Sequence, residues 1–338
     1  MPLISQLRSL ISELIASQGL KVTCFDRWTP ELDEVLQCLP ETGTLPHELF
    51  RLLMKMPDSG KKQLFLVTDR GEPVALVGLR NRWGGWEPVT QWIVPGVLFP
   101  VKDEYLARVL AALRFNIRVA WWRWKIPPPR ACWIRNVVST PTYGSRCAGD
   151  FEHYWRQSDF FKNIRLYRNR CRSFALKVNF PGSREWTIKN WEMRWRRQGM
   201  SEMPDLAERL AASEYLEKKG LYHTLSLLDG VEPVAGITFM IHQNTAVAHV
   251  NYRDPRYDRQ GVMTRLMDLS FYWAREMGFE EIDLGGSFDY KEKWAPANGE
   301  KWEFDVAPAY LLIKATASQS WSNILRRVAV ANCHMGGP

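Results

Sequence analysis

The second half of the chain passes from helical to strand-like patterns of apolar residues. Two apolar runs, 222–229 and 233–241, flank the turn Gly230-Val231-Glu232, which is typical of an antiparallel hairpin. Upstream, apolar residues recur at helical spacing, and the second of these stretches is closed by Gly220. The pattern predicts helices at 187–197, 205–219 and 262–277, strands at 222–229, 233–241, 245–252 and 280–285, and a loop at 253–261.

The first half of the chain follows a similar plan. Its hairpin turns at Arg70-Gly71-Glu72, and both turns lead into the tripeptide Pro-Val-Ala, at 73–75 and again at 233–235. Because the matching turns stand at equivalent places in two similar plans, we expect a tandem duplication. The pattern predicts helices at 2–18, 48–56 and 103–115 and strands at 63–69, 73–80, 91–94 and 117–124.

This order of elements predicts an α/β fold of the α+β layered kind. Each half is expected to form a mixed, mostly antiparallel sheet flanked by helices. A continuous helical pattern over 151–176, rich in arginine on one side, is expected to connect the halves. The predicted organisation is an N-terminal domain at 1–150, a connecting basic helix at 151–176, a C-terminal domain at 177–310 and a tail at 311–338.

The composition is that of a globular protein of about two domains. Hydrophobic residues make up 46% of the 338 positions and charged residues 24%, which excludes disorder as the main state. The net charge of +8 favours an anionic ligand, such as a phosphorylated cofactor or RNA, or else a basic solvated surface. The chain has no apolar run of about 18 residues and no signal peptide pattern, so no membrane span is expected. Its six cysteines include no CxxC pair and are interpreted as reduced thiols of a cytoplasmic protein.

The stretch 249–294 carries the most informative chemistry. A predicted strand leads into an arginine-rich loop that ends in Gly261, where a helix begins. A helix N-terminus after a glycine offers unpaired backbone N–H groups and partial positive charge, which suits a pyrophosphate. The alternative is a plain strand–helix connection with its arginines in solvent. The candidate donor-binding residues are Arg256, Arg259, Gln260, Gly261 and Val262.

Other side chains in this stretch suit amide formation from an activated acyl group. That reaction needs an aligned amine, a donor for the developing oxyanion and a general base. His249, on an otherwise apolar strand, is either a core histidine or a base; Asp283, at a strand end, either caps the next turn or faces the substrate; Asp289 is a third candidate base. Tyr290 could donate a proton to the leaving group. Lys291 could hold a phosphate or the oxyanion, or form a surface ion pair.

Motifs of several other chemistries are missing from the sequence. It contains no HExxH, no GxSxG, no GxxxxGK[ST] and no GxGxxG. Its cysteines and histidines do not cluster with the spacing of zinc ligands, so no metal site is predicted.

Three segments together resemble a known family. They are the aromatic and arginine-rich stretch 151–170, the glycine loop with its helix at 261–277, and Asp-Leu-Gly-Gly followed by Tyr-Lys-Glu-Lys-Trp within 283–294. They resemble tandem GNAT acyltransferases with a BioF2-like (CelD/BcsL-type) acetyltransferase domain, which are related to Fem-type aminoacyltransferases. The resemblance covers roughly 60–305. It implies two GNAT-like domains around a cleft, with the working site in the C-terminal half and a degenerate N-terminal copy.

The resemblance implies an N-acyltransferase that moves an acyl group from an activated donor directly to an amine on a small molecule or peptide. Acyl-CoA is the expected donor, as a cosubstrate and not a resident cofactor, with aminoacyl-tRNA as the alternative. The stretch 119–135 alternates aromatic and basic residues, which is how single-stranded RNA is held, although a strand with tryptophans inward would show the same pattern. A non-catalytic tandem GNAT scaffold is the third interpretation.

Overall fold

The structure, a computed structural model, describes residues 19–41, 46–56, 61–82, 85–90, 99–113, 120–124, 134–199, 206–242, 244–286 and 290–306. The first half of the chain contributes β1 (Leu20–Phe25), α2 (Pro30–Gln37), α3 (His47–Lys55), β2 (Lys62–Asp69), β3 (Glu72–Arg82), β4 (Gly85–Pro88), η1 (Asp103–Tyr105), α4 (Leu106–Leu113), β5 (Ala120–Trp124) and β6 (Ile134–Arg146).

The second half contains the corresponding series. Its elements are α5 (Phe151–Arg156), α6 (Phe160–Arg170), β7 (Ala175–Val178), α7 (Ser183–Arg197), α8 (Leu206–Lys218), β8 (Tyr222–Asp229), β9 (Glu232–His242), β10 (Thr245–Arg253), η2 (Pro255–Gln260), α9 (Val262–Glu276), β11 (Glu281–Gly286), η3 (Lys291–Lys293) and β12 (Ala297–Val306).

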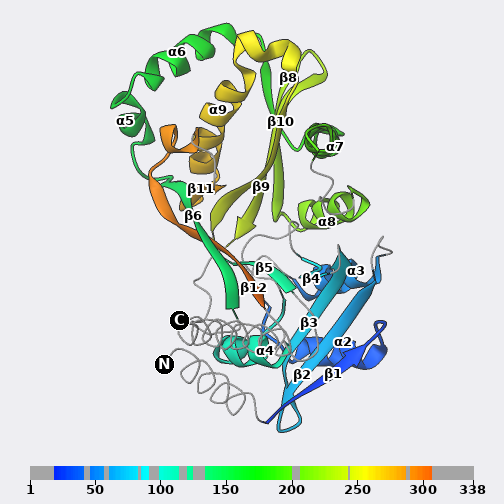
Figure 1. The fold of residues 1–338 in the computed structure, drawn as a ribbon. Coiled ribbons are helices and arrows are strands. Elements are labelled where there is room, and N and C mark those ends of the chain that lie inside the picture. The colour runs from blue at the N-terminus through cyan, green and yellow to red at the C-terminus, as the bar shows by residue number, and fades with distance from the viewer. Residues whose placement is uncertain are drawn as a thin grey trace, which may run out of the picture.

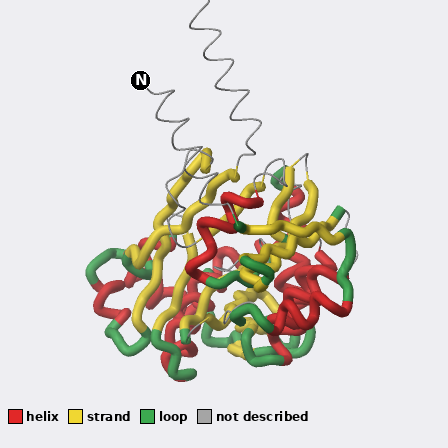
Figure 2. The backbone as a smooth tube through the Cα atoms, turned by 90° about the horizontal axis from the view of Figure 1, so that it is seen from below, coloured by secondary structure: helices red, strands yellow, loops and turns green. Residues whose placement is uncertain are grey.

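The described strands form one mixed, mostly antiparallel sheet in the order β1-β2-β3-β4-β5-β12-β6-β11-β10-β9-β8-β7. In each half a meander of antiparallel strands ends in a parallel pair, β4 with β5 and β10 with β11. The expected α/β layering, with helices against a mostly antiparallel sheet in each half, is confirmed (Figures 1 and 2).

The tandem duplication is visible in the strand register. Lys62 pairs with Arg80 and Tyr222 with Met240, so each residue of the second hairpin stands 160 positions after its counterpart in the first. Both hairpins also carry a β-bulge at the same place, between Val67 and Thr68 in the first. Conserved register over whole hairpins is far more specific than the matching turn sequences that suggested the duplication.

The two halves exchange their last strands. β6, which closes the first half in sequence, pairs with β11 of the second, and β12 pairs with β5 of the first. β6 and β12 also pair with each other, matching Ser139 with Trp302 and Thr142 with Gly299. Gly299 stands 160 positions after Ser139, and Trp302 stands 160 positions after Thr142. Each residue of β6 is therefore paired with the counterpart of the other one, so the two exchanged strands are related by a local pseudo-twofold axis. The exchange makes the two sheets one.

The expectation of one continuous helix over 151–176 is wrong. The Asp150 carboxylate accepts the His153 backbone N–H and starts α5, which stops at Arg156; α6 then begins at Phe160, and residues 175–178 form β7. The sequence pattern also missed β1, α2, β6 and β12. The predicted helix at 2–18, strand at 91–94 and tail at 311–338 lie outside the described residues, and the domain boundaries stay a prediction.

The two faces of the sheet in the second half differ in polarity. Leu225 and Leu227 of β8 point into an apolar core shared with α5, α6 and α9. The alternate residues Thr224 and Ser226 are buried on the other face, which α7 and α8 cover (Figure 1). A strand buried on both faces is usually apolar throughout, so the polar layer under α7 and α8 needs a reason beyond packing.

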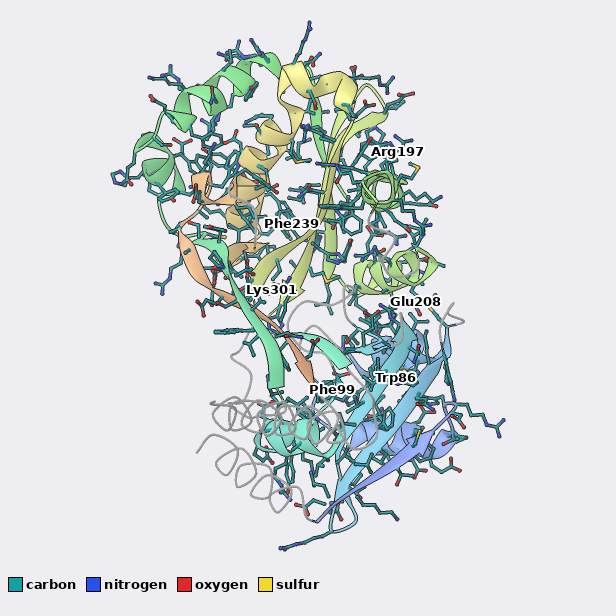
Figure 3. The ribbon with its side chains drawn as sticks, in the orientation of Figure 1. Trp86, Phe99, Arg197, Glu208, Phe239 and Lys301 are labelled. Carbon is teal, nitrogen blue, oxygen red and sulfur yellow. The ribbon has the colours of Figure 1, made fainter. Side chains whose placement is uncertain are left out.

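A buried ion cluster joins the two halves. Glu208 of α8 binds Lys62 with one carboxylate oxygen, and its other oxygen accepts from Arg80 Nη1 at 2.8 Å. Arg80 Nε also donates to Glu87 Oε1 at 2.6 Å. All four side chains are nearly inaccessible to water, and Glu208 lies at the junction seen in Figure 3. The cluster fixes α8 relative to the first half's hairpin.

Candidate functional site

The candidate site lies where two parallel strands separate. β10 and β11 pair only from Thr245 with Glu281 to Val247 with Asp283. Beyond that point β10 continues along β9 as far as Arg253, whereas β11, which pairs with β6 from Glu281 onward, stays with β6 up to Gly286. The sheet therefore parts beside Ala248, and side chains that follow β11 can reach between the two strands.

Lys291 occupies this point of separation. Its Nζ donates a hydrogen bond to the Gly286 carbonyl at 3.0 Å. A Cβ atom placed on Gly285 would lie 3.6 Å from that Nζ and 3.9 Å from the Ala248 carbonyl, so the ammonium is close to both strands. Burial lowers the pKa of Lys291 to about 8, with Lys301 acting in the same direction and Asp283 against it. A partly buried lysine at a strand gap, with its proton weakly held, is typical of a functional site.

Asp283 has the capping role that was one of its two predicted alternatives. Its Oδ1 accepts the Gly285 backbone N–H at 2.6 Å, and the residue is 3% exposed. Its charge also helps to keep Lys291 protonated. Asp283 therefore stabilises the turn at Gly285 and also raises the pKa of Lys291.

Lys301 was missed by the sequence analysis. It lies on the exchanged strand β12, where its Nζ is 3.0 Å from Glu303 Oε1 and its Cδ is within 3.8 Å of where a Cβ of Gly286 would be (Figure 3). Because β12 enters this place only by strand exchange, no local motif marks the residue.

The segment that carries Lys291 is firmly anchored. Trp294 is 3% exposed, and its carbonyl accepts from Trp155 Nε1 at 2.8 Å. Phe160 packs edge-on against the Trp294 ring. The preceding residue, Tyr290, hydrogen bonds to the side chain of Asn251 on β10; partial burial raises its pKa and this bond opposes the rise. Tyr290 and Lys291 therefore face β10 from a fixed support.

His249 is the extra residue of a β-bulge. Ala248 pairs with Phe239 and Val250 with Thr238, which leaves His249 between them. In the first half, Pro88 is equivalent to Ala248 and pairs with Leu79. The backbone N–H of the next residue, Val89, donates to the Gly78 carbonyl, so no extra residue is inserted and His249 has no counterpart there. An extra residue of this kind often re-aims a side chain beside an active site.

His249 contacts polar groups from two other elements. Arg209 Nη1 of α8 lies 3.0 Å from His249 Nε2, and the Tyr222 hydroxyl lies 3.4 Å from Nδ1. A guanidinium can only donate, so Nε2 must be the accepting nitrogen and Nδ1 carries the proton of the neutral ring. The lone pair that a general base needs is thus held by Arg209 in this structure.

The predicted phosphate loop is more compact than the sequence suggested. Residues 255–260 form the 3₁₀ helix η2, and Gly261 begins α9 with φ at +71°. Arg253 is paired with Asp258 and Arg256 with Asp254, both at the surface. Two of the three loop arginines therefore already have a carboxylate partner.

The remaining loop residues are tied to α6. The Arg259 carbonyl accepts from Arg170 and the Gln260 carbonyl from Cys171, while Val262 is buried in the core. Among the described residues, no side chain accepts a hydrogen bond from the first turn of α9. The backbone N–H groups of that turn therefore point out of the helix end without a capping side chain. The loop lies beyond the C-terminal end of β10, and the predicted base Asp289 is outside the described residues.

Gly261 faces Tyr167 and not open space. A Cβ at this position would lie 2.2 Å from the tyrosine ring. We expect Gly261→Ala to destabilise the protein by about 1–3 kcal/mol through this overlap, in addition to the strain of a positive φ. Gly278→Ala is the matched control, because Gly278 has φ +77° with nothing within 4 Å. Chemical unfolding of both variants measures the difference, and equal losses would show that Tyr167 yields without cost.

The family of this region follows from comparison with known proteins. Residues 158–292 match the acetyltransferase (GNAT) domain family. This region is therefore similar to a GNAT acetyltransferase domain. The match runs from the approach to α6 through the predicted phosphate loop and past Lys291, so it includes all the predicted site residues. The resemblance inferred from the three sequence segments is confirmed at this level.

Solved structures share the fold over most of the chain. The C-terminal domain of a protein described as lysylphosphatidylglycerol synthetase from Agrobacterium fabrum is 12% identical with a TM-score of 0.51, over 87% of this chain and 96% of that chain. L-PGS from Bacillus licheniformis is 12% identical with a TM-score of 0.50, over 86% and 97%. FemX gives 11% identity and a TM-score of 0.48 over 87% and 99%. A search of the curated proteins found no match to the chain.

Two negative findings apply to the described residues. None of their helices combines the length and apolarity needed to cross a membrane. They also contain no group of three or more His, Cys, Asp or Glu side chains that could hold a metal ion.

Proposed function

We propose that the protein is an N-acyltransferase that moves an acyl group from acyl-CoA to an amine acceptor. The observation that carries the proposal is the placement of Lys291, a partly buried ammonium between β10 and β11 in the region that matches a GNAT domain. Negative charge develops on the acyl oxygen when an amine attacks, and a fixed cation in a dry site stabilises that charge without reorganisation.

The proposed reaction is a direct transfer. The acceptor nitrogen attacks the thioester carbon, the new C–N bond forms, and the C–S bond breaks as the tetrahedral intermediate collapses. The amine proton passes to a base, for which His249 and Asp283 are the candidates, and Tyr290 supplies a proton to the departing thiolate. Lys291 faces the oxyanion throughout. The donor phosphates lie at Arg259, Gln260, Gly261 and the first turn of α9, with Arg256 at the edge.

Aminoacyl-tRNA is the second candidate donor, and two observations favour it. The ion pairs of Arg253 and Arg256 with neighbouring aspartates reduce the charge available to a pyrophosphate. In addition, α6, the turn that follows it and α7 expose arginines suited to an RNA backbone, at positions 165, 170, 172, 194 and 197.

The two donors are expected to differ in salt dependence. Binding of aminoacyl-tRNA should weaken steeply between low and physiological salt, because many phosphates are neutralised together, whereas coenzyme A should give a shallow slope. Native mass spectrometry of freshly purified protein, followed by salt titration of each ligand, tests this. Bound coenzyme A with no retention of tRNA at low salt supports the acyl-CoA proposal; steep tRNA binding without coenzyme A binding overturns it; binding of neither donor contradicts acyl transfer.

A further inference from the structure

A buried arginine on the α7/α8 face of the second half, Arg209, forms no ion pair with a described carboxylate, although the charge of Glu192 acts on it. Arg209 is 2% exposed, yet no ion pair to it occurs among the described residues. Its Nη1 bonds to His249, its plane lies over Trp191 with the ring centroid at 4.7 Å, and its buried Nη2 has no hydrogen-bond partner in the same part of the chain.

This arrangement is costly for a side chain with only a structural role. Burial lowers the pKa of Arg209 to about 10 although Tyr222 and Glu192 act in the opposite direction, so the charge of Arg209 is only partly compensated. Removing a guanidinium from water costs several kcal/mol unless a counter-ion and hydrogen bonds replace the lost hydration. Other arginines of this layer have such a partner: Arg184 Nε, for example, lies 3.0 Å from Glu217 Oε2. Arg209 therefore keeps an unsatisfied N–H group and a charge that Glu192 compensates only in part, an arrangement that suits a further anion.

The position of Arg209 indicates which anion it would meet. The phosphate loop leads into α9, on the opposite face of the sheet (Figure 1). Arg209 instead lies under His249, one residue from Ala248, where the strands separate around Lys291. An anion there would belong to the acceptor and not to the phosphates of the donor.

Resting on the acyl transfer proposed above, we propose that Arg209 binds a carboxylate of the acceptor, which is accordingly an amino carboxylic acid. The carboxylate replaces His249 Nε2 at the guanidinium and also satisfies Nη2, since arginine binds carboxylates through two parallel N–H groups. The displaced imidazole regains its lone pair. It then accepts the proton of the attacking amine as the C–N bond forms, so the base becomes available only when an acceptor is in place.

The test compares acceptors that differ only in a carboxylate. The probes are L-lysine with cadaverine, L-ornithine with putrescine and β-alanine with ethylamine, measured by calorimetry without donor and by acyl transfer from acetyl-CoA. We expect the full-length protein to bind the carboxylated member of at least one pair about tenfold more tightly or better, as a charge-assisted pair of hydrogen bonds requires. Arg209→Met should abolish the difference and raise KM for the carboxylated acceptor.

A crossed control separates binding from folding. Arg209→Met should leave the melting temperature unchanged or higher, because it removes a buried charge that is only partly compensated. Arg184→Met should lower the melting temperature, because it leaves Glu217 without its partner, while keeping the acceptor preference. A strongly destabilised Arg209→Met, with Arg209→Lys restoring stability but not discrimination, would assign Arg209 a structural role and overturn the proposal.

The remaining outcomes distinguish this proposal from the proposed function. Equal binding within every pair, or no binding of any carboxylated probe, overturns the carboxylate site while acyl transfer can still be measured with other amines. Loss of coenzyme A binding in Arg209→Met overturns it by assigning the arginine to the donor. Discrimination that depends on Arg209, in a protein that transfers no acyl group, supports the carboxylate site and counts against the proposed function.

Discussion

Replacing Lys291 with methionine is expected to lower turnover by roughly 30- to 1000-fold while leaving the protein folded. Methionine keeps the aliphatic bulk between β10 and β11 and removes only the ammonium that donates to the Gly286 carbonyl. A fixed positive charge where negative charge develops is worth about 2–4 kcal/mol in a dry site, which corresponds to this range of rates. Steady-state kinetics with a saturating donor, together with thermal unfolding of the variant, measures both parts.

Lys293→Met is the matched control for this experiment. Lys293 lies two residues away in the same 3₁₀ helix η3 but is exposed, so its charge is screened by water. Its loss should change turnover little. Equal and mild effects of the two substitutions would mean that Lys291 is an ordinary lysine and would remove the main support for the proposed function.

The pH dependence of Lys291 gives a second readout. With a pKa of about 8, the protonated form declines as the pH rises through 8, so a role for the ammonium predicts a falling limb of kcat there. Lys291→Arg, whose charge persists, should move that limb to higher pH. Stability changes in the opposite direction: the unfolded lysine keeps its proton up to about pH 10.4, so the unfolded state binds more protons between these values and the free energy of unfolding rises with pH. Lys291→Met should lack this rise.

Local patterns in the sequence were sufficient to predict the hairpins and the strand–loop–helix–strand series. The turn at Gly230 and the run from Tyr222 to Asp229 agree with the structure because alternation and turn residues are properties of neighbouring positions. The single helix over 151–176 was wrong for a related reason. The apolar positions of this stretch keep helical spacing, yet α5 ends at Arg156. The last residues of the stretch form the short edge strand β7, which is specified by its pairing with β8.

The site could be predicted only as far as its residues are close in sequence. Asp283, Tyr290 and Lys291 form a recognisable string, and the structure places Asp283 and Lys291 together. Lys301 reaches the same place through strand exchange, and Arg209 reaches His249 across α8, so neither contact is encoded in local spacing. Gly261 of the predicted phosphate loop likewise faces the Tyr167 ring of α6, which leaves no space for a side chain at position 261. This contact is not encoded in local spacing either.

Glu208→Gln is expected to lower the free energy of unfolding by about 3–5 kcal/mol, because removing one member of a buried ion cluster leaves an uncompensated charge. Lys62 and Arg80 balance Glu87 and Glu208, so the variant leaves one excess positive charge at a junction closed to water. Urea unfolding measures the loss. Adding Lys62→Met restores the charge balance, so the double variant should lose less than the sum of the two single changes.

The duplication supplies a control at the equivalent position of the first half. Glu48 of α3 stands 160 positions before Glu208 and also reaches across to the other half, where it binds Tyr215 and Lys219. Its side chain is 52% exposed, so Glu48→Gln should change stability little despite the same substitution at the same place in the repeat. Because Glu208 directly precedes Arg209, only its substitution should also weaken acceptor binding, measured as a rise in KM with kcat preserved. A comparable loss of stability in both variants would show that position in the repeat, and not burial of charge, decides the effect.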